Sequence, residues 1–412
     1  MSRRGKHIVA GLDIGTTKIC AIIGEVKSDG VIDVIGIGTH PSRGLKKGMV
    51  VNIDSTVETI RQAMEDAQMM AGVDVGSVYV GIAGGHIMGI NSTGILAVKN
   101  QEITTREIDK VIEAARVVAL PMDREVIHVL PQEFLVDEHH GILDPLGMSG
   151  VRLEARVHIV TAAVASAHSI VKCVNKADLE VEDIVLEQLA ASETILSPDE
   201  RELGVVIIDI GGGSINIALI SGHVVQHTAV LSVGGNHITT DLAFGLHTML
   251  PEAERLKKAH GCAYSSLVGM HETIEVRSPG ERESQTRMRM EICDIIEPRV
   301  EEMLQMVLQE IKQSGYTDSA TAGVVLTGGT ALLPGLVELA EEVFRLPARC
   351  GIPTNIGGLV EMVNSPMYAT GVGLLQFAVK QHHYGRFQKF TDDHLFGKIY
   401  HRMHDWFSEF LA

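Results

Sequence analysis

The sequence is poor in aromatic residues and in cysteine, and it has no long apolar run. Nine Phe, six Tyr and one Trp stand among its 412 residues. The five cysteines lie far apart without Cys-x-x-Cys or Cys/His finger spacing, which argues against a structural zinc site and fits a reducing cytosol. Because no stretch reaches about 18 consecutive apolar residues, we expect no transmembrane helix. Asp13 interrupts the apolar start of the chain, so we interpret that start as a strand and not as a signal peptide.

The chain also has fewer basic than acidic residues. The chain has 35 Lys and Arg against 52 Asp and Glu, a formal net charge of −17. Since neutralising phosphates requires a basic face, we expect no nucleic-acid partner, although a local basic patch remains open. With 45% hydrophobic and 21% charged residues, the composition is that of a folded protein. A chain of this length exceeds one compact core, which predicts two or more domains.

One strand–turn–strand pattern occurs twice. HIVAGLDIGTTKICAIIGEV (7–26) has two β-branched strands around a Gly-containing turn, and GVVIIDIGGGSINIALISGHVV (204–225) repeats the scheme half a chain later. Asp13 and Asp209 each stand two residues before the first Gly of their turn, and each unit returns as a third strand. A unit repeated at this distance predicts two related α/β lobes that face each other.

Both turns have the composition of a phosphate site. Successive N–H groups in a Gly-rich bend form an anion-binding concavity, and neighbouring hydroxyls and a Lys add donors and charge. Two Asp side chains suit Mg²⁺, which keeps most of its waters. One such turn alone could equally be a tight hairpin without a ligand. The occurrence of two matching turns disfavours that alternative. The predicted phosphate-site residues are Asp13, Gly15, Thr16, Thr17, Lys18, Gly211, Gly212, Gly213 and Ser214, with Asp13 and Asp209 as the metal ligands.

Two further segments suggest a site for the rest of a nucleotide. AGVVLTGGTALLPGL (322–336) predicts a buried strand, a Gly-Gly turn and the start of a helix, whose N-terminus attracts anions. A flat Gly-Gly backbone suits an adenine ring. The second segment, PEAERLKKAHG (251–261), predicts a helix. Its charged residues form either a solvated helix face or a site in which an acid binds the ribose hydroxyls with a Lys beside it. The candidates are Gly328, Gly329 and Thr330 in the first segment and Glu254, Lys257 and Lys258 in the second.

LDIGTTK, IIDIGGGS and VVLTGGTALLPG, in this order, resemble the two phosphate motifs and the adenosine motif of the actin, sugar-kinase and heat-shock-chaperone superfamily. The resemblance implies two RNase-H-like lobes with ATP and Mg²⁺ in the cleft between them. It also implies two helical connecting segments, at 183–196 and 368–378. Glu187 falls where members of the superfamily keep the residue that orients the attacking water, so Glu187 and Asp209 are the catalytic candidates.

The segment between SVYVGIAG (77–84) and RLEARVHIVTAA (152–163) has its own strand, helix, strand and strand pattern, with a capping box that starts a helix at 105–118. Its stretches GGHIMGINSTG, HVLPQEF and GMSGVRLEARVHIVT, with HPSRGLKKGMVVNID upstream, resemble the FtsA family of actin-like bacterial cell division proteins. In that family an inserted α+β domain of the SHS2 type, called 1C, contacts the neighbouring protomer.

The resemblance implies an α/β fold with two actin-like lobes around a nucleotide cleft, a small insert and a C-terminal amphipathic helix. The expected ranges are 1–84 and 162–203 for subdomain 1A, 85–161 for 1C, 204–231 and 299–380 for 2A, 232–298 for 2B, 381–395 for a linker and 396–412 for a membrane-targeting helix.

The family's function is implied in the same way. Its members bind ATP, polymerise, tether FtsZ to the cytoplasmic face of the inner membrane at the septum, and recruit later membrane proteins of the division machinery. The C-terminal peptide of FtsZ binds 2B, where Arg287, Arg289 and Arg299 form a local basic face in this sequence, or a solvated helix face. We expect a scaffold with at most slow ATPase activity. The alternatives are an ATP-dependent small-molecule kinase and a PilM-type assembly adaptor.

The chain's last 29 residues hold eight of its aromatic side chains. From 396 onward, apolar and polar residues fall on opposite faces of a helix, which fits a helix docked on the body or one lying in a membrane interface. The preceding linker and the Trp favour the membrane. Lys398 and Arg402 are balanced by Asp405 and Glu409, so we expect apolar insertion with weak salt dependence. The membrane-facing candidates are Phe396, Ile399, Met403, Trp406, Phe407 and Phe410.

Overall fold

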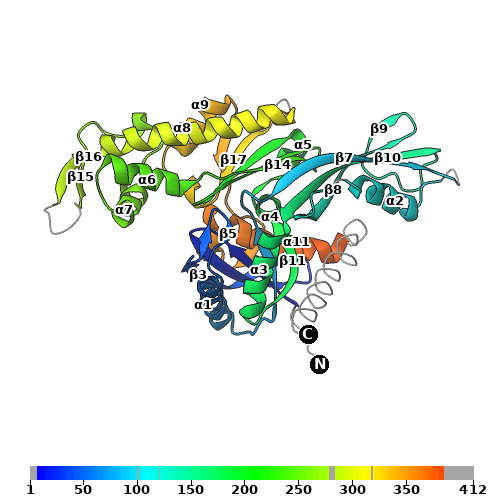
Figure 1. Ribbon diagram of the computed structural model, residues 1–412, viewed down its shortest axis with the longest axis horizontal. Helices are drawn as coiled ribbons and strands as arrows, with labels where there is room; N and C mark the ends of the chain where they lie inside the picture. Colours follow the sequence, from blue (N-terminus) through cyan, green and yellow to red (C-terminus); the bar gives the residue numbers. More distant parts are fainter. Residues whose placement is uncertain (1–6, 100–101, 119, 278–283, 317–318, 385–412) are drawn as a thin grey trace.

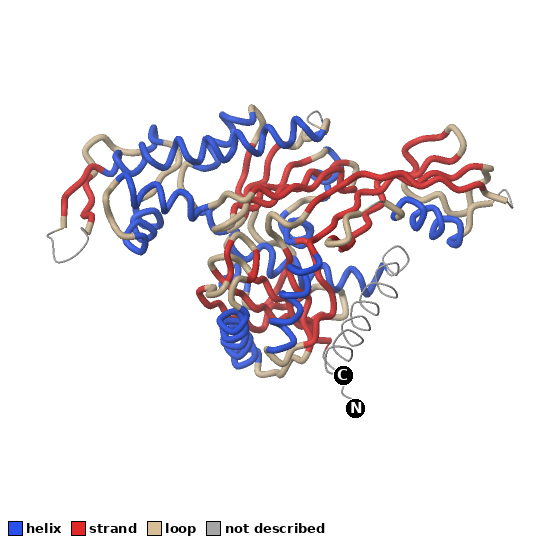
Figure 2. The backbone as a smooth tube through the Cα atoms, in the orientation of Figure 1, coloured by secondary structure: helices blue, strands red, loops and turns tan. Residues whose placement is uncertain are grey.

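The computed structural model describes residues 7–99, 102–118, 120–277, 284–316 and 319–384. Two lobes form the body, one above the other in Figure 1, and a smaller domain with its own sheet projects from one side (Figures 1 and 2). Among the described residues, no helix is long and apolar enough to cross a membrane.

A six-stranded sheet in the order β11-β6-β1-β2-β3-β19 forms the centre of the first lobe. β1, β2 and β3 pair antiparallel, and β6 and β11 continue the sheet in parallel beyond β1. Both faces are covered, which explains the nearly continuous apolar runs of these strands. The strands are β1 (His7–Ile14), β2 (Lys18–Val26), β3 (Ile32–Pro41), β6 (Ser77–Ile82), β11 (Glu180–Leu186) and β19 (Ile356–Gly358), and a short ribbon of β4 (Leu45–Lys46) and β5 (Met49–Val50) follows β3.

The second lobe repeats this order. Its sheet runs β14-β13-β12-β17-β18. Counted along the chain, these are the third, second, first, fourth and fifth strands of the lobe. The strands β3-β2-β1-β6-β11 of the first lobe stand in the same order. The prediction of two related α/β lobes is therefore confirmed. The strands are β12 (Val205–Ile210), β13 (Ile215–Ser221), β14 (Val224–Leu231), β17 (Gly323–Thr327) and β18 (Ala348–Cys350), and a separate hairpin of β15 (Thr273–Val276) and β16 (Gln285–Met288) lies at the far end of the lobe.

Helices cover both faces of the first sheet. One apolar core joins the sheet to α1 and α3, and a second core joins its other face to α4 and α11. Asn52 caps α1 by accepting a hydrogen bond from the Ser55 N–H. Residues of α4 also pack on β12 and β13, so this helix connects the two lobes. The helices are α1 (Ile53–Ala71), α3 (Val164–Lys176), α4 (Glu187–Ile195), α5 (Pro198–Leu203), α10 (Val360–Val363) and α11 (Ala369–Tyr384).

The second lobe has one large core between its sheet and the helices on its outer face. Helix α8 spans that face and contains Pro298 without ending there (Figure 1). The expected boundary between 2B and 2A, at 298/299, therefore falls inside one continuous helix. The helices are α6 (Gly235–Gly245), α7 (Leu250–His260), α8 (Arg289–Ser314) and α9 (Leu336–Phe344), with single 3₁₀ turns at η1 (Ser265–Leu267), η3 (Gly329–Leu332) and η4 (Pro366–Tyr368).

The insert is a four-stranded antiparallel sheet, β7-β10-β8-β9, with one helix packed on it. The predicted helix is present, and Thr104 and Glu107 form its capping box. Strand β10 continues out of the insert into the first lobe, where Val160 and Ala162 join the core. The elements are β7 (Met88–Ala97), α2 (Thr105–Arg116), β8 (Arg124–Val136), β9 (His139–Ile142) and β10 (Arg152–Ala163).

Three sequence-based assignments differ from the structure. The connecting segment 183–196 is helical only from Glu187, because the apolar run before it pairs with β6 as strand β11. β19 and α11, which fall within the range expected for 2A, pair with β3 and pack on β1 and β2 of the first lobe. Helix α11 runs to Tyr384 and so includes the start of the expected linker. The predicted membrane helix, 396–412, lies outside the described residues.

Candidate functional site

Two hairpin turns stand at the ends of matching strands. The Gly15 N–H donates to the Lys18 carbonyl at 2.9 Å and closes the turn between β1 and β2. The Gly211 N–H donates to the Ser214 carbonyl at 3.0 Å and closes the turn between β12 and β13. The two turns thus have the same local geometry, which follows from the same Gly-containing sequence pattern in both lobes.

The turns of the two lobes touch each other. A Cβ atom on Gly212 would lie 2.2 Å from Cγ2 of Thr17, and one on Gly213 would lie 2.8 Å from Oγ1 of Thr16. Glycine is therefore required in the second turn because the first turn occupies the adjacent space. The predicted phosphate-site residues, which lie about half a chain apart in sequence, are brought together at the junction of the lobes.

The tips of both turns present unused donors. Within the described residues, no hydrogen bond engages the backbone N–H groups of Thr16, Thr17, Gly212 or Gly213. Four such groups on two facing turns place positive partial charge at the junction of the lobes, which suits the oxygens of a polyphosphate. The Thr16 hydroxyl has a separate role, because it accepts a hydrogen bond from the Gly48 N–H at 3.0 Å.

A buried Lys–Asp pair lies beside the first turn. Nζ of Lys18 lies 2.5 Å from Oδ2 of Asp13, and both side chains are largely buried. Burial opposes the charge on Lys18, but the attraction of Asp13 outweighs it and raises the pKa of Lys18 above its usual value. Lys18 is therefore a fixed positive charge at physiological pH, as a phosphate-binding residue must be.

Glu187 and Asp209 complete a group of three buried carboxyls with Asp13. Burial and the nearby Asp13 raise the pKa of Asp209 to about 6. Burial, Asp13 and Asp209 also raise the pKa of Glu187 well above its usual value. A divalent cation on the two Asp side chains would add positive charge beside Lys18 and would favour the ionised form of these carboxyls. Among the described residues, no group of three or more His, Cys, Asp or Glu side chains has the geometry to hold a metal ion by itself. The two Asp side chains would therefore leave most of the coordination of Mg²⁺ to water and phosphate oxygens.

The nucleoside candidates converge on the start of α6. The Gly235 N–H donates to the Gly211 carbonyl at 2.9 Å, and Oγ1 of Thr330 donates to the same carbonyl at 3.3 Å. Nζ of Lys257 donates to the Gly235 carbonyl at 3.1 Å and lies 2.7 Å from Oε2 of Glu254. Gly235, Lys257, Glu254 and Thr330 therefore form one cluster next to the second hairpin turn.

Lys258 and the Gly-Gly turn are the remaining nucleoside candidates. The exposed Lys258 lies 3.1 Å from Glu254, so a second Lys stands beside that carboxylate. Gly328 has φ 85°, and a Cβ on it would lie 2.2 Å from Oδ1 of Asp209. The expected helix start after Gly329 is wrong, since a 3₁₀ turn follows and α9 begins only at Leu336. The N-terminus of α6, and not that of α9, is the helix end beside the second hairpin turn.

Three features of this region were missed from the sequence. Asn216 on β13 donates from Nδ2 to Oε2 of Glu187 at 3.1 Å, and Thr370 at the start of α11 hydrogen-bonds Asp209. Lys47, with φ 51°, lies against Gly213. A buried Asn within an apolar strand was a usable signal for Asn216. Thr370 and Lys47 reach the site through long-range folding, for which the sequence carries no local pattern.

The three arginines proposed for peptide binding are each already paired with carboxylates. Arg287 contacts Glu291 at 3.1 Å, and Arg289 contacts Glu272 at 2.6 Å. Arg299 contacts both Asp241 and Glu302. Arg289 and Arg299 are ten residues apart on α8, a rise of about 15 Å, so the three do not form one compact patch. The membrane-facing candidates from Phe396 to Phe410 lie outside the described residues.

Family models match two parts of the chain. Residues 206–373 match the model described as cell division protein FtsA, and residues 84–161 match the model described as the SHS2 domain inserted in FtsA. The cell division protein FtsA of Pseudomonas aeruginosa is 49% identical over 377 residues, which cover 92% of this chain and 90% of the relative. That of Neisseria meningitidis is 42% identical over 376 residues, which cover 91% of each.

Solved structures share the fold at low identity. The PilM-PilN type IV pilus biogenesis complex matches with a TM-score of 0.66 at 17% identity, over 91% of this chain and 99% of the other. MreB 5 of Spiroplasma citri bound to AMPPNP matches with a TM-score of 0.55 at 14% identity, over 92% of this chain and 99% of the other. These likenesses confirm the actin-like fold expected from the sequence and carry no further conclusion.

Proposed function

The chain belongs to the FtsA family of cell division proteins, and we propose that it is an ATP-controlled scaffold that links FtsZ to the membrane. In this proposal it binds ATP and Mg²⁺ between its lobes and polymerises. It holds the FtsZ C-terminal peptide on 2B and attaches to the cytoplasmic face of the inner membrane at the septum through residues 396–412. It then recruits later membrane proteins of the division machinery.

The observation that carries the nucleotide part is the contact between the two hairpin turns. Their free N–H groups, at Thr16, Thr17, Gly212 and Gly213, would hold phosphate oxygens. Lys18 would add a fixed charge, while Asp13 and Asp209 would hold Mg²⁺, which supplies charge neutralisation at the phosphates when bound. Glu254 and Lys257 would contact the ribose, and the Gly328-Gly329 backbone would support the base.

Glu187 is the residue we assign to orienting the attacking water. Its carboxyl is buried, and Asn216 holds it through a hydrogen bond at 3.1 Å. Burial and the neighbouring Asp13 and Asp209 raise the pKa of this carboxyl, which makes its carboxylate a stronger base toward a bound water. Since the acid is fixed by a residue of the second lobe, its alignment depends on how the lobes sit against each other. We therefore propose slow turnover that is linked to assembly.

A small-molecule kinase is the alternative from another functional class. It would need a substrate pocket facing the terminal phosphate. The two described cavities, of about 280 and 410 Å³, are lined by residues of β1 and β6 and of α8 and α9, away from both hairpin turns. The insert takes the place of a substrate domain and matches the FtsA-specific SHS2 model. The match of the insert favours the scaffold, whereas the two cavities do not separate the alternatives, because both also lie away from the turns that would hold ATP.

Liposome co-sedimentation with ATP tests the proposal. The full-length chain should sediment with vesicles of inner-membrane lipids, and a chain truncated after residue 395 should stay in the supernatant. Because Lys398 and Arg402 are balanced by Asp405 and Glu409, the binding that the tail supplies should persist at high salt. Rapid phosphorylation of a small acceptor in a steady-state assay would instead support the kinase.

A further inference from the structure

A two-residue loop at the tip of the β4–β5 ribbon carries a lysine in an unusual backbone conformation. β4 and β5 pair antiparallel on either side of Lys47 and Gly48. Both loop residues have positive φ, 51° at Lys47 and 76° at Gly48, as in a type I′ turn. Asn, Asp and Gly favour the first position of such a turn, because other side chains are strained there. A lysine at this position therefore indicates a role beyond folding.

The tip of this hairpin is fixed against the second phosphate turn. A Cβ on Gly213 would lie 3.0 Å from Cα of Lys47 and 2.8 Å from Oγ1 of Thr16. The Gly48 N–H donates to the same Thr16 hydroxyl oxygen at 3.0 Å. On its other side the hairpin meets the first lobe, where a Cβ on Gly48 would lie 2.7 Å from the Ala83 carbonyl oxygen. The backbone of Lys47 is thus held beside the tips of both turns.

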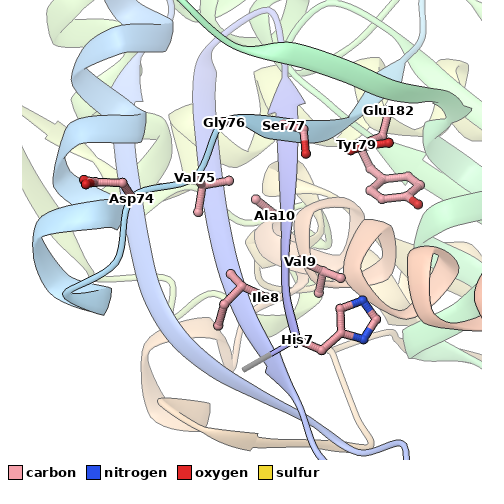
Figure 3. Close-up of a pocket in the computed structure, with 10 residues that line it drawn as sticks. All are labelled: His7, Ile8, Val9, Ala10, Asp74, Val75, Gly76, Ser77, Tyr79 and Glu182. Carbon is pink, nitrogen blue, oxygen red and sulfur yellow. The ribbon is translucent and has the colours of Figure 1, made fainter. Parts of the chain in front are cut away.

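The hairpin stands at the end of the first lobe that carries the phosphate turn. Figure 1 shows β5 near the junction of the two lobes. β1 leads from His7 to the first turn, and the cavity of about 280 Å³ beside His7 lies toward the opposite end of that strand (Figure 3). That cavity therefore does not compete with the hairpin for a phosphate group.

The contacts of the second turn indicate which end of a polyphosphate would lie near Lys47. The Gly211 carbonyl accepts hydrogen bonds from Gly235 and Thr330, two members of the cluster that would hold the nucleoside. Gly213, at the other end of the turn, lies against Lys47. A nucleotide whose nucleoside lies on that cluster would extend its phosphates from Gly211 toward Gly213. The phosphate nearest to Lys47 would then be the terminal one.

Lys47 differs from the other lysines of the site in having no acidic partner. Nζ of Lys18 lies 2.5 Å from Asp13. Nζ of Lys257 lies 2.7 Å from Glu254. Among the described residues, no Asp or Glu is within ion-pair distance of the half-buried Lys47. Its charge is therefore not offset by a neighbouring acid, and its flexible four-carbon stem allows the ammonium to reach a phosphate oxygen at the tips of the turns.

We propose that Lys47 binds the terminal phosphate of ATP and makes the chain prefer ATP over ADP. The inference rests on the proposed function and deepens it, since it names the group that distinguishes the two nucleotides. An ammonium beside a terminal phosphate forms charge-assisted hydrogen bonds, and ADP, which lacks that phosphate, cannot form them. Binding of ATP then offsets the strain of the left-handed backbone at Lys47.

Competition of ATP and of ADP, each with Mg²⁺, against a fluorescent ADP analogue on the full-length chain tests the proposal. Lys47→Asn removes the charge and places a favoured residue at this turn position. We expect its affinity for ATP to fall on the order of tenfold and its affinity for ADP to stay unchanged. Its urea midpoint should equal or exceed that of wild type. Lys47→Arg, which retains a positive charge, should keep the preference for ATP.

Lys46→Asn is the matched control, because it removes an exposed lysine from the neighbouring position on β4. Both of its nucleotide affinities should equal those of wild type. Equal changes for ATP and ADP in Lys47→Asn, or no change for either, would overturn the inference and leave nucleotide binding intact. A lower urea midpoint with equal losses would instead assign Lys47 a structural role. A wild-type chain that binds neither nucleotide would overturn the proposed function as well, so the two failures are distinguishable.

Discussion

Asn216 of the second lobe donates a hydrogen bond to Glu187 at the start of α4, with 3.1 Å between Nδ2 and Oε2. Glu187 is also the first residue after β11 of the first lobe, and α4 packs against both lobes. The proposed catalytic carboxyl is therefore held by a contact between the lobes. A change in the angle of the lobes would move this residue relative to the phosphate turns.

Replacing Glu187 tests its assignment. Glu187→Gln should slow phosphate release on the order of a hundredfold, because the amide cannot accept a proton from water. Nucleotide affinity should be retained, since the turns that would hold the phosphates are unchanged. Single-turnover phosphate release and equilibrium binding of a fluorescent ATP analogue measure the two quantities separately.

The same substitution at an exposed site, Glu58→Gln on α1, controls for the loss of one carboxyl. Glu187→Gln should also fold at least as well as wild type, because it removes a buried acid that Asp13 and Asp209 already disfavour. Unchanged phosphate release in the variant would show that another group orients the water.

Gly328 and Gly329 offer a pair of substitutions that separates folding from binding. Gly328→Ala should destabilise the chain by roughly 2 kcal/mol or more, because φ is 85° and the new methyl would overlap Oδ1 of Asp209. No atom lies within 4 Å of a Cβ on Gly329, so Gly329→Ala should fold normally. If the base lies on this backbone, Gly329→Ala should still weaken ATP binding.

Urea denaturation and ATP binding on both variants check this prediction. Normal stability of Gly328→Ala would mean that Asp209 adopts another position in solution. Normal ATP affinity of a well-folded Gly329→Ala would exclude the Gly-Gly turn as the adenine platform.

Peptide binding by Arg299 should depend on its present partner. Arg299 contacts Asp241 of α6, so a peptide carboxylate must replace that contact. Arg299→Glu should reduce affinity for the FtsZ C-terminal peptide tenfold or more, whereas Asp241→Asn should preserve or increase it by releasing the guanidinium. Fluorescence anisotropy with a labelled peptide measures both effects.

Lys312→Glu, an exposed charge reversal farther along the same helix, is the control for overall charge. Unchanged affinity of Arg299→Glu would remove this residue from the peptide site. A loss of affinity with Asp241→Asn would mean that the ion pair itself shapes the site.

His158 makes stability depend on pH at the contact between the insert and the second lobe. Its ring bonds Asn91 at 2.6 Å and Thr228 at 2.8 Å, and burial lowers its pKa to about 4. Between that value and the ordinary pKa of about 6.5 the unfolded chain binds the extra proton, so the free energy of unfolding falls as pH falls. At pH 5 this residue should account for about 2 kcal/mol of the loss.

His158→Gln cannot titrate, so its free energy of unfolding should change about 2 kcal/mol less than that of wild type between pH 7 and pH 5. Urea titrations at the two pH values provide the comparison. His86 and His128, whose pKa values burial also lowers to about 4, keep part of the pH dependence in the variant. The exposed His139→Gln is the control, and an identical slope for His158→Gln and wild type would contradict a buried neutral ring.

Much of the site could be predicted because its signals are local. Each hairpin turn is encoded within a few residues, by β-branched strands that flank Gly and by an Asp at a constant offset. Helix α2 is encoded by the capping box of Thr104 and Glu107 and by apolar residues at helical spacing. The assignments that failed depend on distant partners. β19 is too short to be recognised and exists only because β3 offers an edge, and the first half of 183–196 is a strand because β6 lies beside it.

The sequence by itself determined the repeated unit, the chemistry of its turns, the insert and the balanced charge of the C-terminal tail, because each depends on residue types at short spacing. Tertiary structure alone decided that the turns of the two lobes touch and that Asn216 holds Glu187. It likewise decided that α11 belongs to the first lobe, where it packs on β1 and β2. These relationships arise from packing across hundreds of residues, where contact depends on how whole sheets and helices fit and not on any local pattern.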